Sequence, residues 1–483
     1  MSMMTLQEIL DATKGQLVNF PESMSPSEYT IESVSTDTRT ISEGDLFLAL
    51  IGEKFDGHAY TVQAVQDGAR ALVVSSLEQV PEQVPSVLVS DTKIALENIA
   101  AYYREKIGCK VVAVTGSVGK TSTREMIACA LSAGTKVYAT KNNENNEIGL
   151  SKTILAAPAD TKVIVLEMGM RLRGEISELT HIAKPDVAVI TNIGVAHIER
   201  LGSRDEILNA KLEILEGLKE DGLLIIPASD EMLKIALSDG RIGPDVKVAF
   251  TASEKDEIPS RACGKAVAGD PYFAGGWMHF SADAGFDTMQ QMDLKLSTIG
   301  LHHVGNALAG ILCGLYLGIA PNLLCEGVAS FCQVGHRERL VEVEGVHFLD
   351  DSYNAGPESM MSAYTSIRRL AGSGRAFACV ADMLELGDVS SEMHFNTGVK
   401  AAQEKLDGVL VLGRFKEDVK AGIRSVDAEL PVICCEDKPQ MVEELKKLVK
   451  PGDFVLLKAS HSFMMYTILE EYASIFKEGG RGQ

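Results

Sequence analysis

The chain has 483 residues and a formal net charge of -21 at pH 7. This length exceeds what one hydrophobic core usually organises, so about two to four domains are expected, with three as the first estimate. The acidic balance argues against a broad nucleic-acid surface. We find neither a secretory leader pattern nor an apolar stretch long enough to span a bilayer, and therefore expect a cytoplasmic protein without membrane insertion.

Residues 1–90 mix short strands and helices and predict a small α/β domain, with strands expected near 45–50 and 71–74. Two polar clusters lie beside strands, and their members are Ser35, Asp37, Thr38 and Arg39 in the first and Asp56, Gly57 and His58 in the second. Taken alone, these clusters favour a turn held by Asp37 and an exposed loop at Gly57 over a binding role.

Residues 111–122 predict a strand, a phosphate-binding loop and the start of a helix. Four apolar residues lead into the loop, whose sequence is Thr115-Gly116-Ser117-Val118-Gly119-Lys120-Thr121-Ser122. Such a loop directs backbone N–H groups at phosphate oxygens, while its lysine reaches the terminal phosphates and the next hydroxyl can ligate Mg²⁺. The loop is shorter than the common G-x-x-x-x-G-K-[ST] pattern, which indicates a narrower group of nucleotide-binding proteins. The alternative is a glycine turn that binds nothing.

Three more polar side chains are expected near this loop. Glu167 ends an apolar strand at 163–166, His197 follows another at 187–190, and Lys211 lies on a helix expected over 205–218. Because ligand sites gather at the carboxyl ends of parallel strands, these groups and Thr121 predict a site for magnesium-dependent phosphoryl transfer. Each group has an alternative role, since Glu167 could cap the following helix, His197 could lie in a turn and Lys211 could be solvated.

The rest of the chain predicts the end of a central domain and one further domain. Residues 223–300 alternate short strands with turns and suggest no chemistry, and an apolar stretch at 307–320 predicts a buried helix. We place the central domain at 91–333. Residues 334–483 alternate strands and amphipathic helices, as in a doubly wound α/β domain, with strands expected at 346–349, 376–380, 408–412, 431–434 and 454–457.

These segments, in this order, resemble the Mur ligase family of peptidoglycan synthesis over nearly the whole chain. The phosphate loop, the amide-rich segment 142–150 and the segments 350–357 and 382–387 carry the resemblance. The last two are typical of the branch that adds D-alanyl-D-alanine. The resemblance implies a small N-terminal α/β domain that binds a UDP substrate, a central P-loop ATPase domain with a parallel sheet, and a C-terminal Rossmann-like doubly wound domain.

The resemblance also implies roles for the metal and phosphate groups. Lys120 would serve the phosphates, and Mg²⁺ would lie on Thr121 and Glu167. A second Mg²⁺ would lie near His197 and Lys211, which is carbamylated in this family. Lys120, Glu167, His197 and Lys211 are therefore the expected catalytic residues.

Substrate contacts follow from the same resemblance. Asn306 would contact the adenine of ATP and Asp351 its ribose. The two N-terminal clusters, together with Asn146, would bind the UDP part of the other substrate. The family's nucleotide-contacting G-R pair is replaced here by Gly335-His336, which leaves Arg337 as the stand-in for the arginine.

Three further departures from the family pattern occur. The family's G-x-H-N-x-x-N segment corresponds to residues 300–306, where His302 and Asn306 are kept and His303 replaces the middle asparagine. Gly356 replaces an asparagine of the 350–357 segment. Near the C-terminus, Lys458-Ala459-Ser460-His461 replaces K-G-S-R. None of these changes removes an expected metal or phosphate ligand.

The implied activity is an ATP-dependent amide-bond ligase with ATP and Mg²⁺ as cofactors. The substrates would be UDP-N-acetylmuramoyl-tripeptide and D-alanyl-D-alanine, joined through an acyl phosphate, and we expect a monomer. The alternatives are a ligase that adds a single amino acid, a folylpolyglutamate synthase, and a P-loop ATPase or binding protein without ligase activity. The segment 350–357 favours the first assignment.

Overall fold

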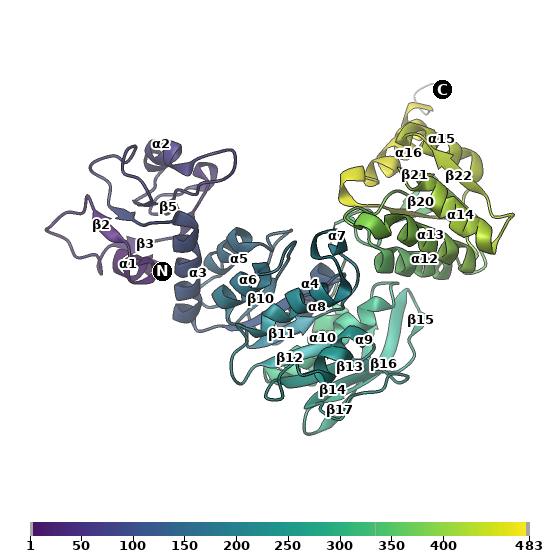
Figure 1. Cartoon of the computed structure of the whole chain (residues 1–483), viewed down its shortest axis with the longest axis horizontal. Coiled ribbons are helices and arrows are strands. Elements are labelled where there is room, and N and C mark those ends of the chain that lie inside the picture. The colour runs from purple at the N-terminus through teal and green to yellow at the C-terminus, as the bar shows by residue number, and fades with distance from the viewer. Residues whose placement is uncertain (1–2, 334, 480–483) are drawn as a thin grey trace.

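The computed structural model describes residues 3–333 and 335–479. It shows three α/β lobes, with the purple N-terminal lobe at one end, the teal central lobe in the middle and the green to yellow C-terminal lobe at the other end (Figure 1). The expected three-domain α/β fold class is confirmed. The domain boundary expected at Val334 lies outside the described residues.

The N-terminal lobe is built on a five-stranded sheet in the order β2-β7-β6-β5-β4. These strands are β2 (Gln16–Val18), β4 (Val34–Ser35), β5 (Leu46–Leu48), β6 (Ala71–Val74) and β7 (Ser86–Leu88). A separate antiparallel pair joins β1 (Met4–Thr5) to β3 (Thr30–Ile31). The helices of the N-terminal lobe are α1 (Leu6–Thr13) and α2 (Thr61–Gln66). β6 covers the expected range because all four of its residues are apolar and buried.

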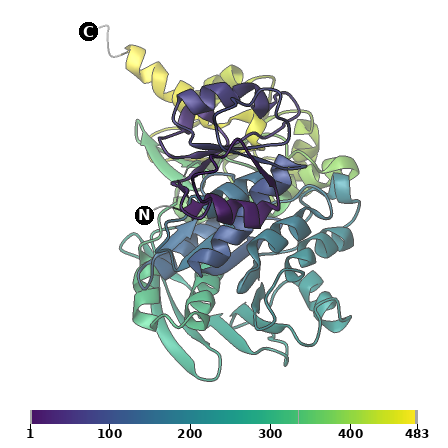
Figure 2. The same cartoon turned by 90° about the vertical axis from the view of Figure 1, so that its left-hand side faces the viewer.

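Helix α3 (Thr92–Ile107) lies between the N-terminal and central lobes (Figure 1). Viewed from that end, the purple N-terminal lobe lies in front of the other two (Figure 2). It begins at Asp91, whose carboxylate accepts hydrogen bonds from the N–H groups of Lys93 and Ile94, and it ends at Gly108 with φ 62°. An N-cap carboxylate and a left-handed glycine are the usual signals for helix start and end. The buried face of α3 packs against α1 and against helices of the central lobe.

The central sheet has ten strands in the order β15-β16-β14-β13-β12-β11-β8-β10-β9, with β17 beside β16. The strands are β8 (Lys110–Thr115), β9 (Val137–Ala139), β10 (Val163–Glu167), β11 (Val187–Ile190), β12 (Leu223–Pro227), β13 (Lys247–Ser253), β14 (Gly264–Ala268), β15 (Tyr272–Ala274), β16 (Trp277–Gly285) and β17 (Met289–Leu296). From β9 to β14 the strands are parallel, as expected, whereas β15 to β17 form an antiparallel extension that the sequence did not predict.

Helices cover both faces of the central sheet. One face carries α4 (Lys120–Ser132), α10 (His302–Tyr316) and α11 (Pro321–Ala329). The other carries α3 together with α5 (Glu147–Leu155), α6 (Glu175–Ala183), α8 (Arg204–Leu212) and α9 (Glu231–Ser238). The short α7 (Ile198–Leu201) precedes α8. The expected helix over 307–320 therefore begins and ends earlier, at His302 and Tyr316.

The helix expected over 205–218 is shorter in the structure. α8 ends at Leu212, and only a single 3₁₀ turn, Glu213–Leu215, follows. Thr180 on α6 donates a hydrogen bond from Oγ1 to the carbonyl of Ile214 at 2.9 Å. Because this carbonyl is taken by a neighbouring helix, a tertiary contact overrides the local helical pattern.

The C-terminal lobe has a six-stranded sheet in the order β18-β19-β23-β20-β21-β22, parallel except for β18. Its strands are β18 (Arg339–Val343), β19 (Val346–Asp350), β20 (Ala376–Val380), β21 (Gly408–Leu412), β22 (Val432–Cys435) and β23 (Phe454–Lys458). Helices α12 (Pro357–Ala371), α13 (Ser390–Gln403) and α14 (Lys416–Val426) cover one face. Helices α15 (Lys438–Leu448) and α16 (Tyr466–Gly479) cover the other, which makes the lobe doubly wound.

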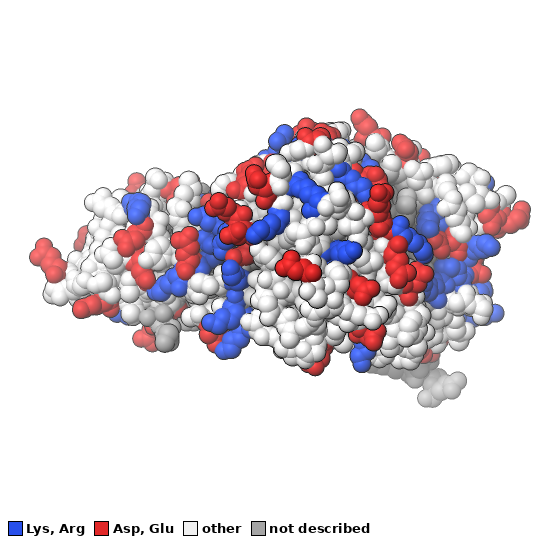
Figure 3. All heavy atoms as spheres, turned by 90° about the horizontal axis from the view of Figure 1, so that it is seen from below, with Lys and Arg blue, Asp and Glu red and all other residues white. Residues whose placement is uncertain are grey.

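The surface carries charges of both signs. Basic and acidic side chains are interspersed over the face seen from below, so the described residues form no broad basic area on that face (Figure 3). Within residues 3–333 and 335–479, no helix combines the length and apolarity that a membrane crossing requires.

Candidate active site

The phosphate loop joins β8 to α4, and its glycines have backbone conformations that disfavour other residues. Gly116 has φ 150°, and a Cβ there would lie 1.9 Å from Oγ1 of Thr191. Gly119 has φ 86°. Only glycine enters such conformations at little cost, so the loop depends on both residues. Helix α4 then begins at Lys120, which leaves the free N–H groups of its first turn at the loop.

The segment after β11 holds the loop in place. Asn192 accepts a hydrogen bond at Oδ1 from the N–H of Val118 at 3.0 Å, and the N–H of Gly194 donates to Oγ of Ser117 at 2.9 Å. Lys120 donates from Nζ to the carbonyl of Gly116 at 2.8 Å, and burial lowers its pKa. The loop is therefore ordered by contacts of its own chain.

A cavity of about 1660 Å³ lies between the central and C-terminal lobes. It brings together most of the residues expected to bind ATP and metal, and those lining it are Ser117, Val118, Gly119, Lys120, Thr121, Ser122, Glu167, His197, Asn306, Arg337 and Asp351. Thr115 is buried beneath the loop, where its Oγ1 donates to the carbonyl of Met168 at 2.9 Å.

Glu167 lies at the end of β10 with its side chain 2% exposed. Its Oε1 accepts a hydrogen bond from Asn145 Nδ2 at 2.9 Å. Its Oε2 lies 3.9 Å from Nη1 of Arg124 and has no hydrogen-bond partner among the described residues. The alternative that Glu167 caps the following helix is wrong, because that helix, α6, begins eight residues later at Glu175. A buried carboxylate oxygen without a donor fits a cation ligand.

His197 follows β11 in a left-handed conformation with φ 65°. Its Nδ1 lies 2.7 Å from Oε2 of Glu385, a residue of the C-terminal lobe. Burial lowers the pKa of His197, and Glu385 opposes this shift while Lys120 and Lys211 add to it. His197 therefore lies in the electrostatic field of both lysines and contacts the opposite side of the cleft.

The burial of Lys211 is the least expected feature of these residues, because a helix lysine is usually solvated and this one, on α8, is only 1% exposed. Its ammonium group has no hydrogen bond or ion pair among the described residues. Burial, together with the positive charge of Lys120, holds its pKa well below the usual value. The alternative of a solvated helix lysine is wrong, and the side chain is an unpaired amine close to Lys120.

Three residues reach the phosphate loop region from further along the chain. Asn306 on α10 accepts a hydrogen bond at Oδ1 from Thr123 Oγ1 at 2.9 Å. Arg337 donates from Nη2 to Thr121 Oγ1 at 3.3 Å, and its guanidinium lies 4.0 Å from the centre of the Tyr353 ring. Asp351 accepts a 2.5 Å hydrogen bond from Lys458 Nζ, while burial raises its pKa.

The first N-terminal cluster is ordered by its own contacts. Asp37 accepts hydrogen bonds from Nε and Nη2 of Arg39 at 2.9 and 2.6 Å, and this arginine lowers the pKa of Asp37 to about 2. Buried Ser35 donates to the carbonyl of Asp37 at 2.9 Å. Thr38 begins the 3₁₀ turn Thr38–Thr40, which Asp37 caps, so the expected turn held by Asp37 is present.

The second N-terminal cluster is more buried than expected. The backbone N–H of Ser75 donates to His58 Nε2 at 2.9 Å, so His58 Nδ1 donates to Asp56 Oδ1 at 2.6 Å. Gly57 is buried, and a Cβ there would lie 2.7 Å from the carbonyl oxygen of Leu50. The alternative of an exposed loop at Gly57 is therefore wrong.

The structure does not bring these two N-terminal clusters into the cavity, since none of their residues lines it. Asn146 does line it, and its Oδ1 also caps α5 by accepting from the N–H of Gly149 at 2.9 Å. The charge of Lys152, on the same helix, contributes to the lowered pKa of Asp37, which places the first cluster on the side of the lobe that faces α5.

Sequence reasoning missed two residues that contact expected site residues and hold them in position. Asn145 holds Glu167, and Glu385 holds His197. Both lie in segments that carry the family resemblance, 142–150 and 382–387, so a signal for these regions was present. Which side chain within each segment faces the site depends on the folded chain.

Models of three protein families match the chain. The Mur ligase family, catalytic domain, matches residues 30–125, the Mur ligase middle domain matches residues 114–314, and the Mur ligase, glutamate ligase domain, matches residues 336–461. A UDP-N-acetylmuramoyl-tripeptide–D-alanyl-D-alanine ligase of Bacillus subtilis (strain 168) is 35% identical over 469 residues, which cover 97% of this chain and 98% of the relative.

Solved structures agree with this result. The chain matches a crystal structure of MurF from Acinetobacter baumannii with a TM-score of 0.84 and 27% identity, over 98% of this chain and 99% of the other. MurF ligase from Thermotoga maritima in complex with ADP matches with a TM-score of 0.78 and 29% identity, over 92% and 98%. Together with the arrangement of the cleft, these matches show that the chain belongs to the Mur ligase family.

Proposed function

We propose that this protein is a MurF-type ligase that joins D-alanyl-D-alanine to UDP-N-acetylmuramoyl-tripeptide at the expense of ATP. The observation that carries the proposal is that the phosphate loop and Glu167, whose Oε2 accepts no hydrogen bond from the described residues, line one cleft, while the buried amine of Lys211 lies close enough to Lys120 for that charge to lower its pKa. A nucleotide switch needs the loop but has no use for a buried lysine beside it. The full-length similarity to a ligase with this activity supports the same conclusion.

The reaction activates a carboxylate that is a poor acyl donor at neutral pH. The terminal carboxylate of the tripeptide takes the γ-phosphoryl group of ATP, and ADP leaves. The amine of D-alanyl-D-alanine then attacks the acyl carbon, the bond to the phosphate oxygen breaks, and the nitrogen loses a proton. Transfer between two anions depends on alignment and charge neutralisation, which Lys120 and the loop N–H groups would supply.

The residues of the cleft fit Mg²⁺. Thr121 and Glu167 would hold one ion, and His197 with Lys211 would hold a second, so that Mg²⁺ would neutralise phosphate and carboxylate charge. Because its pKa is lowered, Lys211 can be a neutral amine, which adds to CO₂ with loss of a proton to form a carbamate. This reaction would convert a cationic side chain into an anionic oxygen ligand.

The remaining contacts of ATP are those that the family resemblance implies, and the three residues concerned line the cleft. Asn306 would contact the adenine, Asp351 the ribose, and Arg337 the nucleotide beside Thr121. The lobes would close around the reactants and exclude water from the acyl phosphate.

The UDP part of the tripeptide substrate would bind at the N-terminal lobe, through the two polar clusters at 35–39 and 56–58 and through Asn146.

We assign the domains to residues 1–90, 91–333 and 334–483. A monomer in the cytoplasm fits best, since the cleft is complete within one chain and its substrates are nucleotide-linked metabolites.

Phosphate release measured with ATP, UDP-N-acetylmuramoyl-tripeptide and D-alanyl-D-alanine tests the proposal when each is omitted in turn. Phosphate should form only when all three are present, together with one pentapeptide per phosphate. Phosphate release that does not depend on the dipeptide and yields no pentapeptide would show an ATPase instead. A single amino acid that replaces the dipeptide at equal rate would show the other ligase branch.

A further inference from the structure

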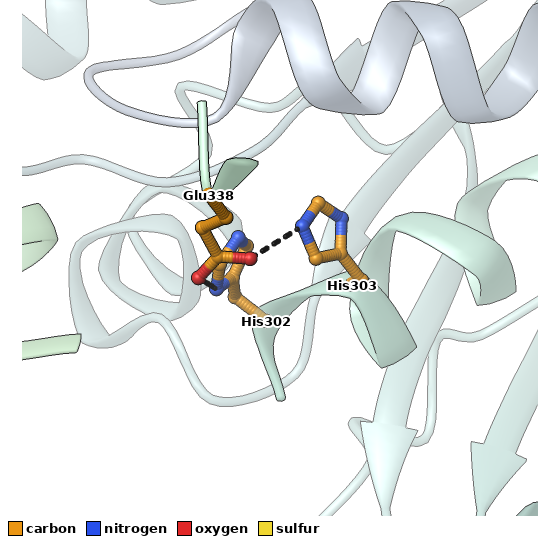
Figure 4. A group of neighbouring side chains, drawn as sticks. All are labelled: His302, His303 and Glu338. Carbon is orange, nitrogen blue, oxygen red and sulfur yellow. Dashed lines mark hydrogen bonds and ion pairs between the residues drawn. The ribbon is translucent and has the colours of Figure 1, made fainter. Parts of the chain in front are cut away.

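Two histidines and a glutamate meet where the central lobe joins the C-terminal lobe (Figure 4). His302 and His303 are the first two residues of α10, and Glu338 directly precedes β18. His303 stands where the family pattern has asparagine, so this histidine of the cluster is a departure from that pattern. None of the three residues is among the Mg²⁺ ligands proposed above.

The ligand atoms are close enough to share one ion. Glu338 Oε2 lies 3.2 Å from His303 Nε2, and Glu338 Oε1 lies 3.9 Å from His302 Nδ1. All three ligand atoms lie within 4.8 Å of one another. Ligands of a tetrahedral Zn²⁺ with bonds of about 2.0–2.1 Å lie about 3.3 Å apart, so small side-chain movements suffice. The Gln333 side-chain amide also contacts His303 Nε2 and adds a fourth polar group.

The buried negative charge of Glu338 would be stabilised by a cation. Its side chain is 5% exposed, and no lysine or arginine forms an ion pair with it in the described part of the chain. The groups that donate to its carboxylate, Thr298 and Ser366 among them, lie at 3.2 Å or more. A buried carboxylate is costly unless it is paired or coordinates a metal. Two imidazoles and one carboxylate are the ligand set of many three-residue zinc sites.

We propose that His302, His303 and Glu338 bind a transition-metal dication such as Zn²⁺. His302 and Glu338 line the cleft, and the His302 side chain is 40% exposed, so a water molecule can reach the fourth position. Imidazole ligands favour zinc and related ions, whereas Mg²⁺ prefers oxygen ligands, and this difference separates the site from the magnesium site at Glu167.

The ion would connect two lobes. His302 and His303 belong to the helix that packs on α4, whereas Glu338 leads into the C-terminal sheet. The N–H of Glu338 donates to Asp351 Oδ1 at 3.3 Å, and Asn306 Nδ2 lies 3.3 Å from His303 Nδ1. Metal binding would therefore order the junction beside the residues proposed to hold the nucleoside of ATP.

Zinc titration of the metal-free full-length protein, in competition with a chromophoric chelator, tests this site. The wild type should bind Zn²⁺ in the presence of millimolar Mg²⁺. His303→Asn, which restores the family residue, and Glu338→Gln should each weaken one equivalent by at least roughly 10-fold. His181→Asn, at an exposed histidine of α6, is the matched control and should bind as the wild type does.

His197→Asn separates this site from the proposed magnesium site. If the proposal is correct, this variant keeps the equivalent that His303→Asn loses. Zinc binding that disappears in His197→Asn and persists in His303→Asn overturns the proposal, as does a wild type that binds no Zn²⁺. Zinc should also raise the thermal unfolding temperature of the wild type and leave that of His303→Asn unchanged, since only a folded site binds the ion.

Discussion

Lys211 and Lys120 lie close together, and only Lys120 has, among the described residues, a hydrogen-bond partner for its charged group. Lys120 donates to the carbonyl of Gly116, whereas Lys211 is buried without a partner in the described residues. Burying a cation without compensation is expensive, and its usual consequence is a lowered pKa. This cost explains why Lys211 is a better candidate for chemical modification than any exposed lysine of the chain.

Replacing Lys211 by alanine should abolish ligase activity, because the carbamate oxygen ligands are lost. Added acetate or formate should restore part of the rate, since short carboxylates can occupy the same space. Lys234→Ala, at a lysine paired with Glu231 on the surface, should keep near wild-type activity. The measurement is phosphate release with all three substrates, and ¹³C NMR after addition of ¹³C-bicarbonate reports the carbamate directly.

Lys211→Arg distinguishes the carbamate from a simple requirement for positive charge. Arginine keeps the charge and does not form the carbamate. Unchanged activity of Lys211→Arg would refute the carbamate and leave the rest of the site in place.

Gly116→Ala should disrupt the phosphate loop more than the addition of one methyl group suggests. The added Cβ would meet Oγ1 of Thr191 at 1.9 Å in a backbone conformation with φ 150°. We expect binding of a fluorescent ATP analogue to weaken at least roughly tenfold and the thermal unfolding temperature to fall. Gly240→Ala is the control, because φ is 84° there and no atom lies within 4 Å of the added Cβ. Equal effects of the two substitutions would show that strain alone, and not the contact with Thr191, matters.

Among the elements, α3 stands out because it connects two lobes and carries a charged cluster. Lys93 lies 2.7 Å from Glu178 on α6, 3.5 Å from Glu147 on α5 and 3.7 Å from Glu97 on α3 itself. Burial, followed by the neighbouring Glu178, raises the pKa of Glu97 to about 7. One lysine thus faces three carboxylates, of which Glu97 carries the raised pKa.

Glu97→Gln should stabilise the protein at alkaline pH. The folded-state pKa of Glu97 lies above the unfolded value of about 4.3, so its favourable contribution is complete below that pH and is lost as pH rises through 7. Glutamine removes this loss, and the free energy of unfolding should rise by about 1 to 3 kcal/mol at pH 8, with a smaller gain at pH 5. Urea unfolding at both pH values provides the measurement.

Glu326→Gln is the matched control for this prediction, since Glu326 is an exposed helical glutamate, on α11, that forms no ion pair with the described residues. It should change the urea midpoint little at either pH. A gain for Glu97→Gln that is equal at pH 5 and pH 8 would contradict the raised pKa of Glu97.

Elements were predictable where the local pattern and the tertiary environment agree. β6 and β11 cover their expected ranges, because both are continuous buried apolar strands. Short strands were expected over 223–300, but the antiparallel pairing of β15 to β17 was not predicted. β17 is buried mostly at alternate residues, and Trp277 and its neighbours pair only with strands that lie beyond the parallel sheet. Pairing partners of this kind are not encoded in a short window of sequence.

At the scale of the whole molecule, the cleft depends on contacts between lobes. Arg337 reaches Thr121, Glu385 reaches His197, and Glu358 accepts a hydrogen bond from the N–H of Val195 at 3.3 Å. Each contact joins the C-terminal lobe to a loop at the carboxyl edge of the central sheet. Polar contacts between the lobes therefore hold groups of both lobes together at the cleft.

Arg337→Ala should raise KM for ATP about tenfold or more, because a charge-assisted hydrogen bond contributes about 1.5–3 kcal/mol. Arg339→Ala, at an exposed arginine two residues later, is the control and should leave KM near the wild-type value. Initial rates of pentapeptide formation at varied ATP provide both constants. An unchanged KM in Arg337→Ala would show that this residue does not replace the arginine of the family's G-R pair.

The sequence by itself determined the fold class, the phosphate loop and the order of the segments that identify the family. These features depend on residue types at short spacing, where local conformation and side-chain chemistry are sufficient. Only the tertiary structure decided that, among the described residues, Lys211 is buried without a partner, that one oxygen of Glu167 accepts no hydrogen bond, and that Glu338 meets two histidines. Burial and partnership arise from contacts between residues far apart in the chain, so no local pattern specifies them.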